Sequence, residues 1–157
     1  GGRYDPEIFN VIADKGCTYV LTHSRGNSKT MDSFAKYTNV VKDVKNELFN
    51  QIDLALSKGN KNQQIIIDPG IGFAKTVDQN LTLLRNLEEF VSMKYQVLIG
   101  ASRKRFIGSV INESDPKKRI FGTAAVASRC VIAGVDFLRV HDIKEISQVI
   151  KMTNSII

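Results

Sequence analysis

Four short apolar segments, separated by longer amphipathic stretches, constrain most strongly how this chain can fold. They are TYVLTH, QIIID, QVLIG and DFLRVH, at residues 18–23, 64–68, 96–100 and 136–141. Each is rich in β-branched or aliphatic residues and nearly continuous in its apolarity, which is typical of parallel strands covered on both faces. The sequence therefore predicts a parallel α/β sheet.

The first long stretches between these segments have helical spacing. Within residues 40–58, apolar residues recur every three or four positions, and Gly59 stands where that helix would end. Thr76 and Gln79 have the capping-box pattern, in which the two side chains satisfy each other's backbone N–H groups, before a row of leucines. These patterns predict two helices that cross over between strands.

The ends of the chain show similar patterns. Asp142 with Glu145 predicts another capping box. Pro116 is expected to open a helix that runs through RIFGTAAVASRCVIAG, because proline is favoured in the first turn of a helix. By the same argument, Asp5-Pro6 opens a helix that ends near Lys15.

Two architectures alternate strands and helices in this way: an open doubly wound sheet and a (β/α)8 TIM barrel. A barrel needs eight strand–helix units in about 250 residues, whereas this chain has 157 residues and four predicted strands. If the fold is a barrel, the chain is its C-terminal half, with strands five to eight and their helices. Residues 1–157 would then form part of one domain.

Composition excludes some classes of protein and leaves others open. No apolar run approaches the roughly 18 to 20 residues needed to span a bilayer, and the opening GGRYDPEIF lacks the features of a signal peptide. Cys17 and Cys130 lie in apolar contexts without the spacing of metal ligands, which favours a reducing compartment. The net charge of +6 fits either an anionic ligand or a basic nucleic-acid-binding module.

Each predicted strand ends in ionisable residues. The carboxyl ends of parallel strands meet at one rim, where α/β proteins bind their ligands. One acid at such a place is commonly a turn or cap residue, but four consecutive ends with such groups indicate a binding site. The residues are His23 and Arg25, then Asp68, then SRKR at 102–105, then Arg139 and His141.

The basic residues of the last two strand ends predict an anion site. Arg103, Lys104 and Arg105 follow the third strand, and loops after the last strands of barrels frequently hold phosphate. In RVHD, Arg139 and His141 are two positions apart, so strand alternation places both on one side of the strand and Val140 on the other. If the fold is a barrel, we expect the first side to be its interior and Val140 to pack against the outer helices. Neither nucleotide-binding glycine fingerprint is present.

Four motifs resemble a known family. DPGIGFAKT, LIGASRKRFIG, RIFGTAAV and RVHD, in this order and spacing, are similar to dihydropteroate synthase, and THSRGNSKTM and GGRYDP extend the resemblance along the chain. The resemblance implies a (β/α)8 barrel. It also implies condensation of 6-hydroxymethyl-7,8-dihydropterin diphosphate with 4-aminobenzoate, which gives 7,8-dihydropteroate and pyrophosphate in folate biosynthesis.

The resemblance also implies roles for individual residues. Asp68 resembles the carboxylate that accepts hydrogen bonds from the amino-pyrimidine edge of the pterin. Lys104 resembles the lysine that reaches the pterin carbonyl near the aminobenzoate pocket. Arg139 resembles an arginine that stacks on the pterin and addresses phosphate, and His141 a pyrophosphate ligand. The expected catalytic residues are thus Lys104, Arg139 and His141.

Other residues are expected to line the pockets. Phe73 resembles an aromatic residue shared by both pockets, and Gly100 allows the pterin to approach closely. Thr22 replaces a methionine that many relatives pack against the pterin, and Arg105 replaces a serine of many bacterial members at the aminobenzoate end. Ser102 and Arg103 are expected to support the site rather than take part in the chemistry.

The resemblance further implies a Mg²⁺ ion whose main ligand is an asparagine of the first strand, upstream of this chain. No metal ligand is assigned within the sequence itself. The expected partners are the two substrates and sulfonamide inhibitors, with no nucleic acid and no membrane. A full-length chain is expected to form a homodimer in the cytoplasm or, in a eukaryote, the mitochondrion, with fusion to other folate-pathway enzymes left open.

Two alternatives remain at this point. A corrinoid methyltransferase would use a related pterin-binding barrel, but methyl transfer needs no pyrophosphate site, and SRKRF argues against it. A nucleic-acid-binding module would interleave basic and aromatic residues on one face, whereas the basic residues here are scattered apart from SRKR.

Overall fold

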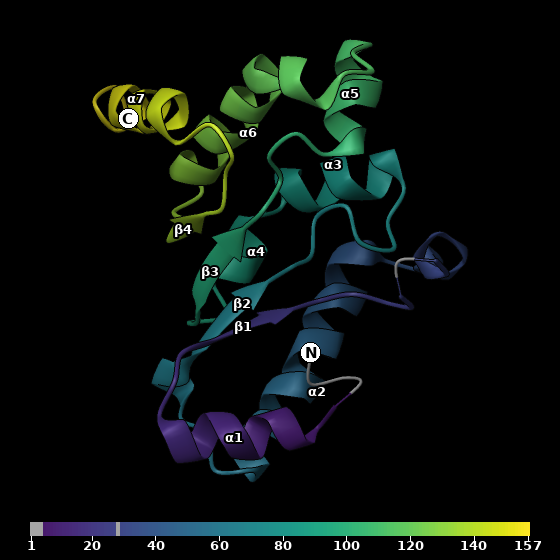
Figure 1. The fold of residues 1–157 in the computed structure, drawn as a ribbon, viewed down its shortest axis with the longest axis vertical. Helices are drawn as coiled ribbons and strands as arrows, with labels where there is room; N and C mark the ends of the chain where they lie inside the picture. The colour runs from purple at the N-terminus through teal and green to yellow at the C-terminus, as the bar shows by residue number, and fades with distance from the viewer. Residues whose placement is uncertain (1–4, 28) are drawn as a thin grey trace.

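Four parallel strands form the sheet of the protein, in a computed structural model that describes residues 5–27 and 29–157 (Figure 1). The strands lie side by side in chain order. They are β1 (Tyr19–Thr22), β2 (Ile65–Asp68), β3 (Gln96–Ile99) and β4 (Phe137–Leu138). Thr22 is paired with Asp68 at the carboxyl ends of β1 and β2, so the residues that follow these strands share one rim.

Seven α-helices and three short 3₁₀ turns connect and flank the strands within the described residues. The α-helices are α1 (Glu7–Lys15), α2 (Val40–Ser57), α3 (Val77–Arg85), α4 (Glu88–Val91), α5 (Arg105–Ile111), α6 (Ile120–Ile132) and α7 (Ile143–Asn154). The 3₁₀ turns are η1 (Met31–Phe34), η2 (Asn62–Gln64) and η3 (Pro116–Lys118).

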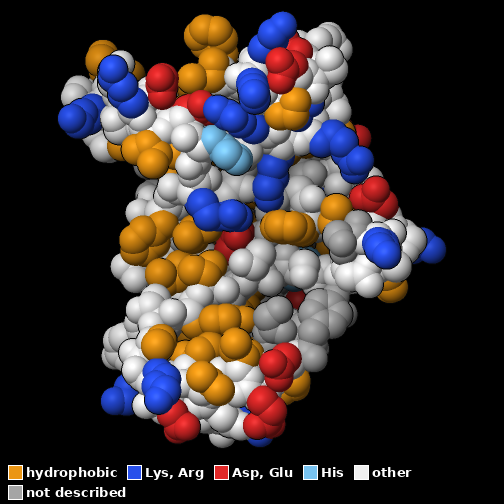
Figure 2. Space-filling view, in the orientation of Figure 1, with side chains coloured by type: hydrophobic (Ala, Val, Ile, Leu, Met, Phe, Trp, Pro, Cys, Tyr) orange, Lys and Arg blue, Asp and Glu red, His pale blue; other side chains and the backbone are white. Residues whose placement is uncertain are grey.

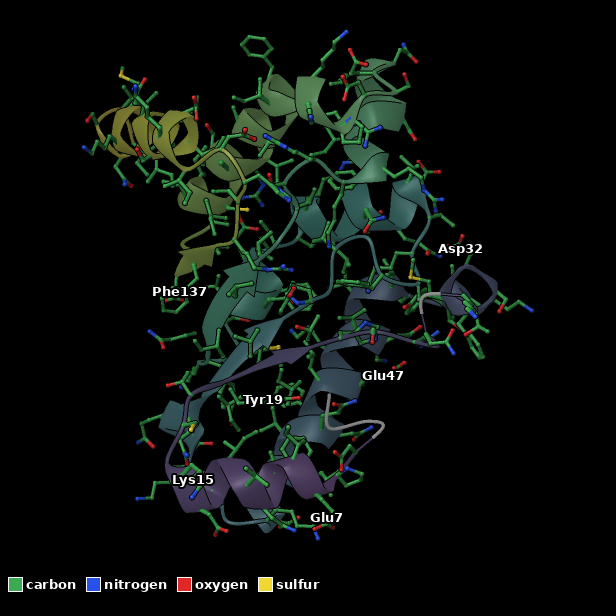
Figure 3. The ribbon with its side chains drawn as sticks, viewed as in Figure 1. Glu7, Lys15, Tyr19, Asp32, Glu47 and Phe137 are labelled. Atoms are coloured by element: carbon green, nitrogen blue, oxygen red, sulfur yellow. The ribbon has the colours of Figure 1, made fainter. Side chains whose placement is uncertain are left out.

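The two faces of the sheet differ in burial. The outer face carries Leu21, Ile67 and Ile99, each no more than 1% exposed and packed in one core with apolar residues of α2 and α3. Tyr19 also lies on this face and packs edge-on against Phe9 of α1, with ring centroids 5.6 Å apart (Figure 3). The inner face, which carries Asp68, keeps apolar residues exposed on both outermost strands. The sheet is therefore covered on one side.

The predicted helices near the middle of the chain are confirmed. Helix α2 has the predicted extent, and its buried stripe has the predicted spacing. The capping box at α3 also forms: Gln79 N–H donates to Thr76 Oγ1 at 3.2 Å, and Thr76 N–H donates to Gln79 Oε1 at 2.9 Å. The first four residues of GGRYDP, and Ser28 of THSRGNSKTM, lie outside the described residues.

One helix start and one helix cap were predicted wrongly. Pro116 opens only the turn η3, which the Asp115 side chain caps by accepting from Lys117 N–H, and α6 begins at Ile120. Helix α7 begins directly after Asp142, as predicted, but Asp142 makes no side-chain cap bond. Its carboxylate instead accepts from Arg103 Nε at 3.1 Å. At Asp142 a tertiary contact therefore replaced the local one.

The fourth strand is shorter than predicted, since β4 covers only Phe137–Leu138. Pairing continues for one bond, because Arg139 N–H donates to Ile99 O at 3.0 Å. The predicted alternation persists beyond the strand. Val140 lines a small cavity together with Val126 and other residues of α6, whereas the Arg139 guanidinium lies against Gly100.

Candidate functional site

A buried carboxylate stands at the centre of the rim. Asp68 is 2% exposed, and it accepts hydrogen bonds from Gly70 N–H at 2.8 Å and from the Thr22 hydroxyl at 3.3 Å. Burial raises the pKa of this carboxyl, while Gly70 N–H and the charge of Lys104 oppose that shift. An ionised carboxylate offers about four lone-pair sites, so Asp68 can accept further hydrogen bonds from a ligand.

Lys104 and Phe73 meet beside Asp68, from the loops that follow β3 and β2. The Lys104 ammonium lies 4.2 Å from the centroid of the Phe73 ring and also donates to Ile71 O. Burial lowers the pKa of Lys104 to about 8. Gly72, whose φ is +81°, leaves room for the lysine stem, since a Cβ there would lie 2.7 Å from Lys104 Cδ. The structure thus brings together three predicted site residues.

Arg139 and His141 complete the rim on the β4 side. A Cβ on Gly100 would lie 2.8 Å from one Arg139 guanidinium nitrogen, so the glycine allows the guanidinium to lie over the backbone. His141 Nδ1 lies 3.0 Å from Ser102 Oγ, which fixes the direction of the imidazole. Lys and Arg side chains gather on one face of the molecule, with a histidine among them (Figure 2). This arrangement is suited to an anionic ligand.

The other two basic residues of SRKR are placed differently. Arg103 has φ +59° and pairs with Asp142, which links the loop after β3 to the start of α7. Arg105 is 80% exposed, with a guanidinium nitrogen 3.5 Å from Asp32 Oδ1; Asp32 is labelled in Figure 3. An exposed pair of this kind contributes little to stability. The expected contact of Arg105 with aminobenzoate stays a prediction.

Sequence reasoning missed a second buried cluster, behind Asp68. Lys75 and His23 are 7% and 3% exposed, and Lys75 Nζ lies 3.0 Å from His23 Nδ1. His23 Nε2 lies 3.3 Å from Glu47 of α2, which also accepts from Arg25. No periodic pattern marks Lys75 as buried, because it lies in a loop. A histidine and an arginine at the end of the first predicted strand were the only indication in the sequence.

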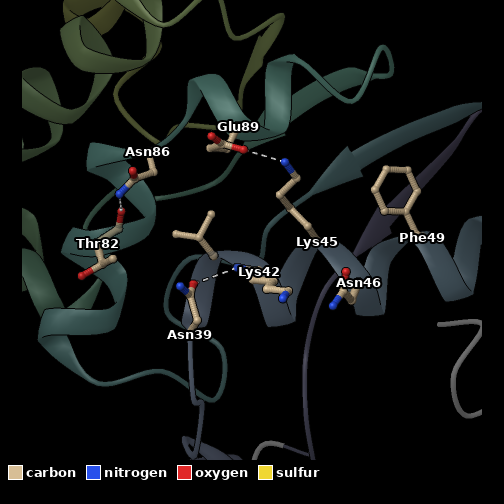
Figure 4. Close-up of a pocket in the computed structure, with 9 residues that line it drawn as sticks. Asn39, Lys42, Lys45, Asn46, Phe49, Thr82, Asn86 and Glu89 are labelled. Atoms are coloured by element: carbon tan, nitrogen blue, oxygen red, sulfur yellow. Dashed lines mark hydrogen bonds and ion pairs between the residues drawn. The ribbon is translucent and has the colours of Figure 1, made fainter.

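Besides the small cavity at Val140, three others are relevant to the choice of site. One of about 310 Å³ is lined by Gly72, Lys75, Lys104 and Arg105 among others, so it adjoins the rim. An apolar groove of about 260 Å³ lies between α3, α5 and α6. A polar groove of about 510 Å³ lies between α2 and the α3–α4 segment, where Lys45 pairs with Glu89 at 2.6 Å (Figure 4). None of the predicted site residues lines that polar groove.

A parallel α/β sheet with a buried carboxylate, a lysine and an arginine–histidine pair at its strand ends defines a class of protein, the α/β proteins that bind ligands at the carboxyl ends of their strands. Comparison with known families makes this specific. The family model described as "Pterin binding enzyme" matches residues 1–141, and the chain therefore belongs to the pterin-binding enzyme family.

Individual relatives agree with this assignment. The chain is 40% identical to "Dihydropteroate synthase" of Synechocystis over 99% of its own length and 54% of the relative. It is 34% identical to "Folate synthesis bifunctional protein, mitochondrial" of Pisum sativum over 99% of its own length and 32% of that protein. The chain spans about half the length of the Synechocystis relative and a third of the Pisum sativum relative.

Solved structures give the same result. Dihydropteroate synthase of Thermus thermophilus matches in complex with 4-aminobenzoate (TM-score 0.94) and with 6HMPPP (TM-score 0.93), each at 36% identity over 99% of this chain. The match covers 60% and 61% of those chains. A Yersinia pestis dihydropteroate synthase with a sulfonamide drug complex matches at 28% identity and a TM-score of 0.92, over 96% of this chain and 55% of that one. These neighbours are TIM barrels, so the predicted fold class, part of a (β/α)8 barrel, is confirmed.

Proposed function

We propose that this chain is the pterin-binding part of a dihydropteroate synthase. The full-length protein would join 6-hydroxymethyl-7,8-dihydropterin diphosphate to 4-aminobenzoate. Relatives named for this activity match along almost the entire chain, and related structures hold 6HMPPP and 4-aminobenzoate. The observation that carries the proposal is Asp68: a buried carboxylate at the rim that can accept further hydrogen bonds, with two cationic side chains close enough to influence its pKa.

The geometry supports a different role in pterin binding for each site residue. Asp68 would accept two N–H bonds from the amino-pyrimidine edge of the pterin, a pairing that suits a carboxylate and a guanidine-like group. Lys104 would donate to the pterin carbonyl. Arg139 would stack its planar guanidinium on the ring, where Gly100 gives it room.

The same residues would serve the chemical step. As the bond between the pterin methylene carbon and the diphosphate oxygen breaks, negative charge grows on the departing pyrophosphate, which Arg139 and His141 would stabilise. The cation left on the carbon is delocalised into the pterin. The aminobenzoate nitrogen attacks that carbon, forms the new C–N bond and loses a proton. No covalent enzyme intermediate is needed.

A Mg²⁺ ion is part of the proposal, with an asparagine of the first barrel strand as its main ligand. Among the residues that the structure describes, no group of three or more histidine, cysteine or acidic side chains comes together to hold a metal. When bound, the ion would add positive charge beside the pyrophosphate.

The wider assignments belong to the same proposal. We extend the domain from the matched residues 1–141 to residue 157, because α7 packs on α6. Sulfonamide binding is proposed by analogy with the Yersinia pestis structure, and a homodimer is proposed for the full-length protein. Among the described residues, no helix is both long and apolar enough to cross a membrane. We propose a cytoplasmic or, in a eukaryote, mitochondrial location, and a role without nucleic acid.

The central test is Asp68→Asn in a full-length protein that contains this chain. The amide replaces one acceptor oxygen by a donor, so pterin affinity should fall by about 1 to 3 kcal/mol, the scale for losing a charged hydrogen-bond partner. Calorimetry with 6-hydroxymethylpterin measures it, and Asp53→Asn, at an exposed position of α2, serves as the matched control. Unchanged pterin affinity in Asp68→Asn would contradict the proposal.

A separate measurement would distinguish the proposed function from the alternative, a corrinoid methyltransferase. The rim carries Arg139 and His141 beside Lys104, so the proposed enzyme should bind the pterin diphosphate more tightly than the unphosphorylated pterin. A methyltransferase pterin domain should show no such preference. A titration in which the pterin diphosphate competes with the unphosphorylated pterin measures this preference and so decides between the two functions.

A further inference from the structure

Lys75 lies at the end of the loop that carries the pterin-facing residues. The loop runs from Asp68 to the start of α3, and its side of the rim holds both Asp68 and Phe73. Although Lys75 is charged in solution, it is 7% exposed here. Its Nζ donates to Gly70 O at 3.0 Å and to Phe73 O at 2.9 Å, and it lies 3.0 Å from His23 Nδ1.

Through these contacts Lys75 binds two other residues of its own loop, Gly70 and Phe73, and both of these affect the site. Gly70 donates its N–H to Asp68 Oδ1, so a shift of Gly70 would move a donor away from the carboxylate. Phe73 N–H donates to Gly70 O at 3.1 Å, and the Phe73 ring supports the Lys104 ammonium. Lys75 thus binds the backbone of Gly70, which contacts Asp68, and of Phe73, whose ring contacts Lys104.

Lys75 is held in turn by His23, which directly follows β1, and through it by Glu47 of α2. His23 lies between Lys75 on its Nδ1 side and Glu47 on its Nε2 side. Glu47 is held in turn by Arg25, whose guanidinium lies 3.9 Å from the centroid of the Tyr37 ring. Burial lowers the pKa of His23 to about 4, so the imidazole is neutral near pH 7 and its Nδ1 can accept from the lysine.

The backbone also fits tightly at this point. Gly70 has φ +71°, and a Cβ there would lie 1.8 Å from His23 O. The loop after β2 therefore packs directly on the end of β1. Because the backbone at Gly70 already packs against the backbone at His23, the Lys75 side chain alone can hold the loop in one position.

Burial lowers the pKa of Lys75 to about 7, so near neutral pH the amine and the ammonium coexist. An ammonium has three N–H donors, which match the two carbonyls and His23 Nδ1. A neutral amine retains two N–H groups for the carbonyls and can accept from the other tautomer of His23. The contacts with Gly70 and Phe73 are compatible with either protonation state.

We infer that Lys75 is a positioning residue for the pterin site: anchored by His23 and Glu47, it holds the Asp68–Phe73 loop in its ligand-binding conformation. This inference rests on the proposed function, because the ligand whose binding it supports is the pterin. Lys75 binds the loop backbone and His23 through its Nζ, and we assign it no part in the chemistry. Its effect reaches the ligand through Asp68 and Phe73.

Lys75→Met tests the inference in the full-length protein, since methionine has a similar length but no donor. We expect about a tenfold or larger loss of affinity for 6-hydroxymethylpterin, the scale of losing buried hydrogen bonds to a charged group. Affinity for inorganic pyrophosphate, which depends on Arg139 and His141, should not change. Hydrogen exchange should quicken at the Gly70 and Phe73 amides, while the α2 amides stay protected. Lys42→Met, at an exposed position of α2, is the matched control.

Lys75→Gln provides a second variant, because its amide keeps two N–H donors on a shorter side chain and should lose less pterin affinity than Lys75→Met. Equal losses of pterin and pyrophosphate affinity, together with a general loss of protection, would show a merely structural role and overturn the inference. Unchanged pterin affinity, or failure of both variants to fold, would overturn it too. If Asp68→Asn also leaves pterin affinity unchanged, the proposed function has failed instead.

Discussion

Arg139 and His141 lie on the same side of the chain but contact different neighbours, so their substitutions should have different effects. Arg139 lies over Gly100, and its charge opposes the rise that burial causes in the pKa of Asp68, whereas the His141 imidazole contacts Ser102. Arg139→Ala should therefore weaken binding of both the unphosphorylated pterin and its diphosphate. His141→Ala should weaken binding of the diphosphate alone.

Calorimetry of both variants with the two ligands and with inorganic pyrophosphate checks this difference. Each lost charge-assisted contact should cost about 1.5 to 3 kcal/mol. Ser102→Ala is an informative comparison, because it removes the partner of the imidazole but leaves the imidazole in place, and it should reproduce part of the His141→Ala effect. Equal losses for both ligands in His141→Ala would contradict the division between the two residues.

His23 should make stability depend on pH in the acid range. Its pKa is lowered by burial to about 4 in the folded protein, from 6.5 as the reference value, with Lys75 and Arg25 opposing its protonation and Glu47 favouring it. The unfolded chain therefore binds more protons between pH 4 and 6.5, and stability falls as pH falls through that window. The shift corresponds to about 3 kcal/mol.

Urea unfolding of the full-length protein at pH 7 and pH 4.5 measures this dependence. His23→Gln lacks the titrating group, so its loss of stability between the two pH values should be smaller than that of the wild type. His141→Gln is the matched control, because His141 is exposed. Parallel losses in His23→Gln and the wild type would show that His23 is not responsible.

The sequence was more informative about the rim than about what lies behind it. Asp68, Arg139 and His141 follow strand segments, and alternation along RVHD predicted the inward side chains and the outward Val140. Lys75 and Glu47 were missed for a physical reason. Their contact with His23 joins β1, a loop and a helix, and no local pattern in the chain encodes a contact between elements 24 to 52 residues apart.

At the scale of elements, Arg119 ties together the loops around α5. It is 7% exposed and donates to the carbonyls of Arg103, Ser114 and Glu113, at 2.9, 2.6 and 2.9 Å. The guanidinium fills the space beside Gly108, where a Cβ would lie 2.5 Å from Arg119 Nε. One side chain thus links the turn before α6 to the loop that carries Lys104.

Arg119→Met should destabilise the full-length protein by about 2 to 4 kcal/mol, because it leaves buried carbonyls without donors. Chemical denaturation measures the change in the free energy of unfolding. Lys118→Met removes a neighbouring exposed cation and should change stability by less than about 0.5 kcal/mol. A small effect in Arg119→Met would mean that other donors replace the guanidinium.

Helix boundaries were predictable where local chemistry decided them. The Thr76–Gln79 box formed as its spacing predicted, since both partners lie within one turn, and the tertiary bond from Gln79 Nε2 to Ala35 O at 3.1 Å does not use the Oε1 atom that the box needs. Asp142 fits the same sequence pattern, but Arg103 lies close enough to take its carboxylate. Pro116 begins a turn rather than α6, and the Asp115 side chain caps that turn locally. A tertiary ion pair therefore decided the case of Asp142 alone.

At the scale of the whole molecule, the strand–helix pattern predicted a parallel sheet and the order of its strands. It left open whether the sheet closes into a barrel, because each unit contacts mainly its neighbours. The relatives resolve this point, since the chain matches part of a TIM barrel. In the described sheet, β1 and β4 each have one paired edge, and their inner faces expose Val20 (37%) and Phe137 (40%; labelled in Figure 3).

The 157-residue chain by itself should therefore self-associate and lack dihydropteroate synthesis. Unpaired strand edges with exposed apolar side chains are templates for association, and lysine on such an edge opposes it. Light scattering should find oligomers of the chain alone, and Val20→Lys with Phe137→Lys should shift it toward monomer. Val11→Lys, at a 55% exposed position of α1, should have no such effect. The expectation fails if the unmodified chain is monomeric and forms dihydropteroate, because the described strand ends would then suffice for a complete site.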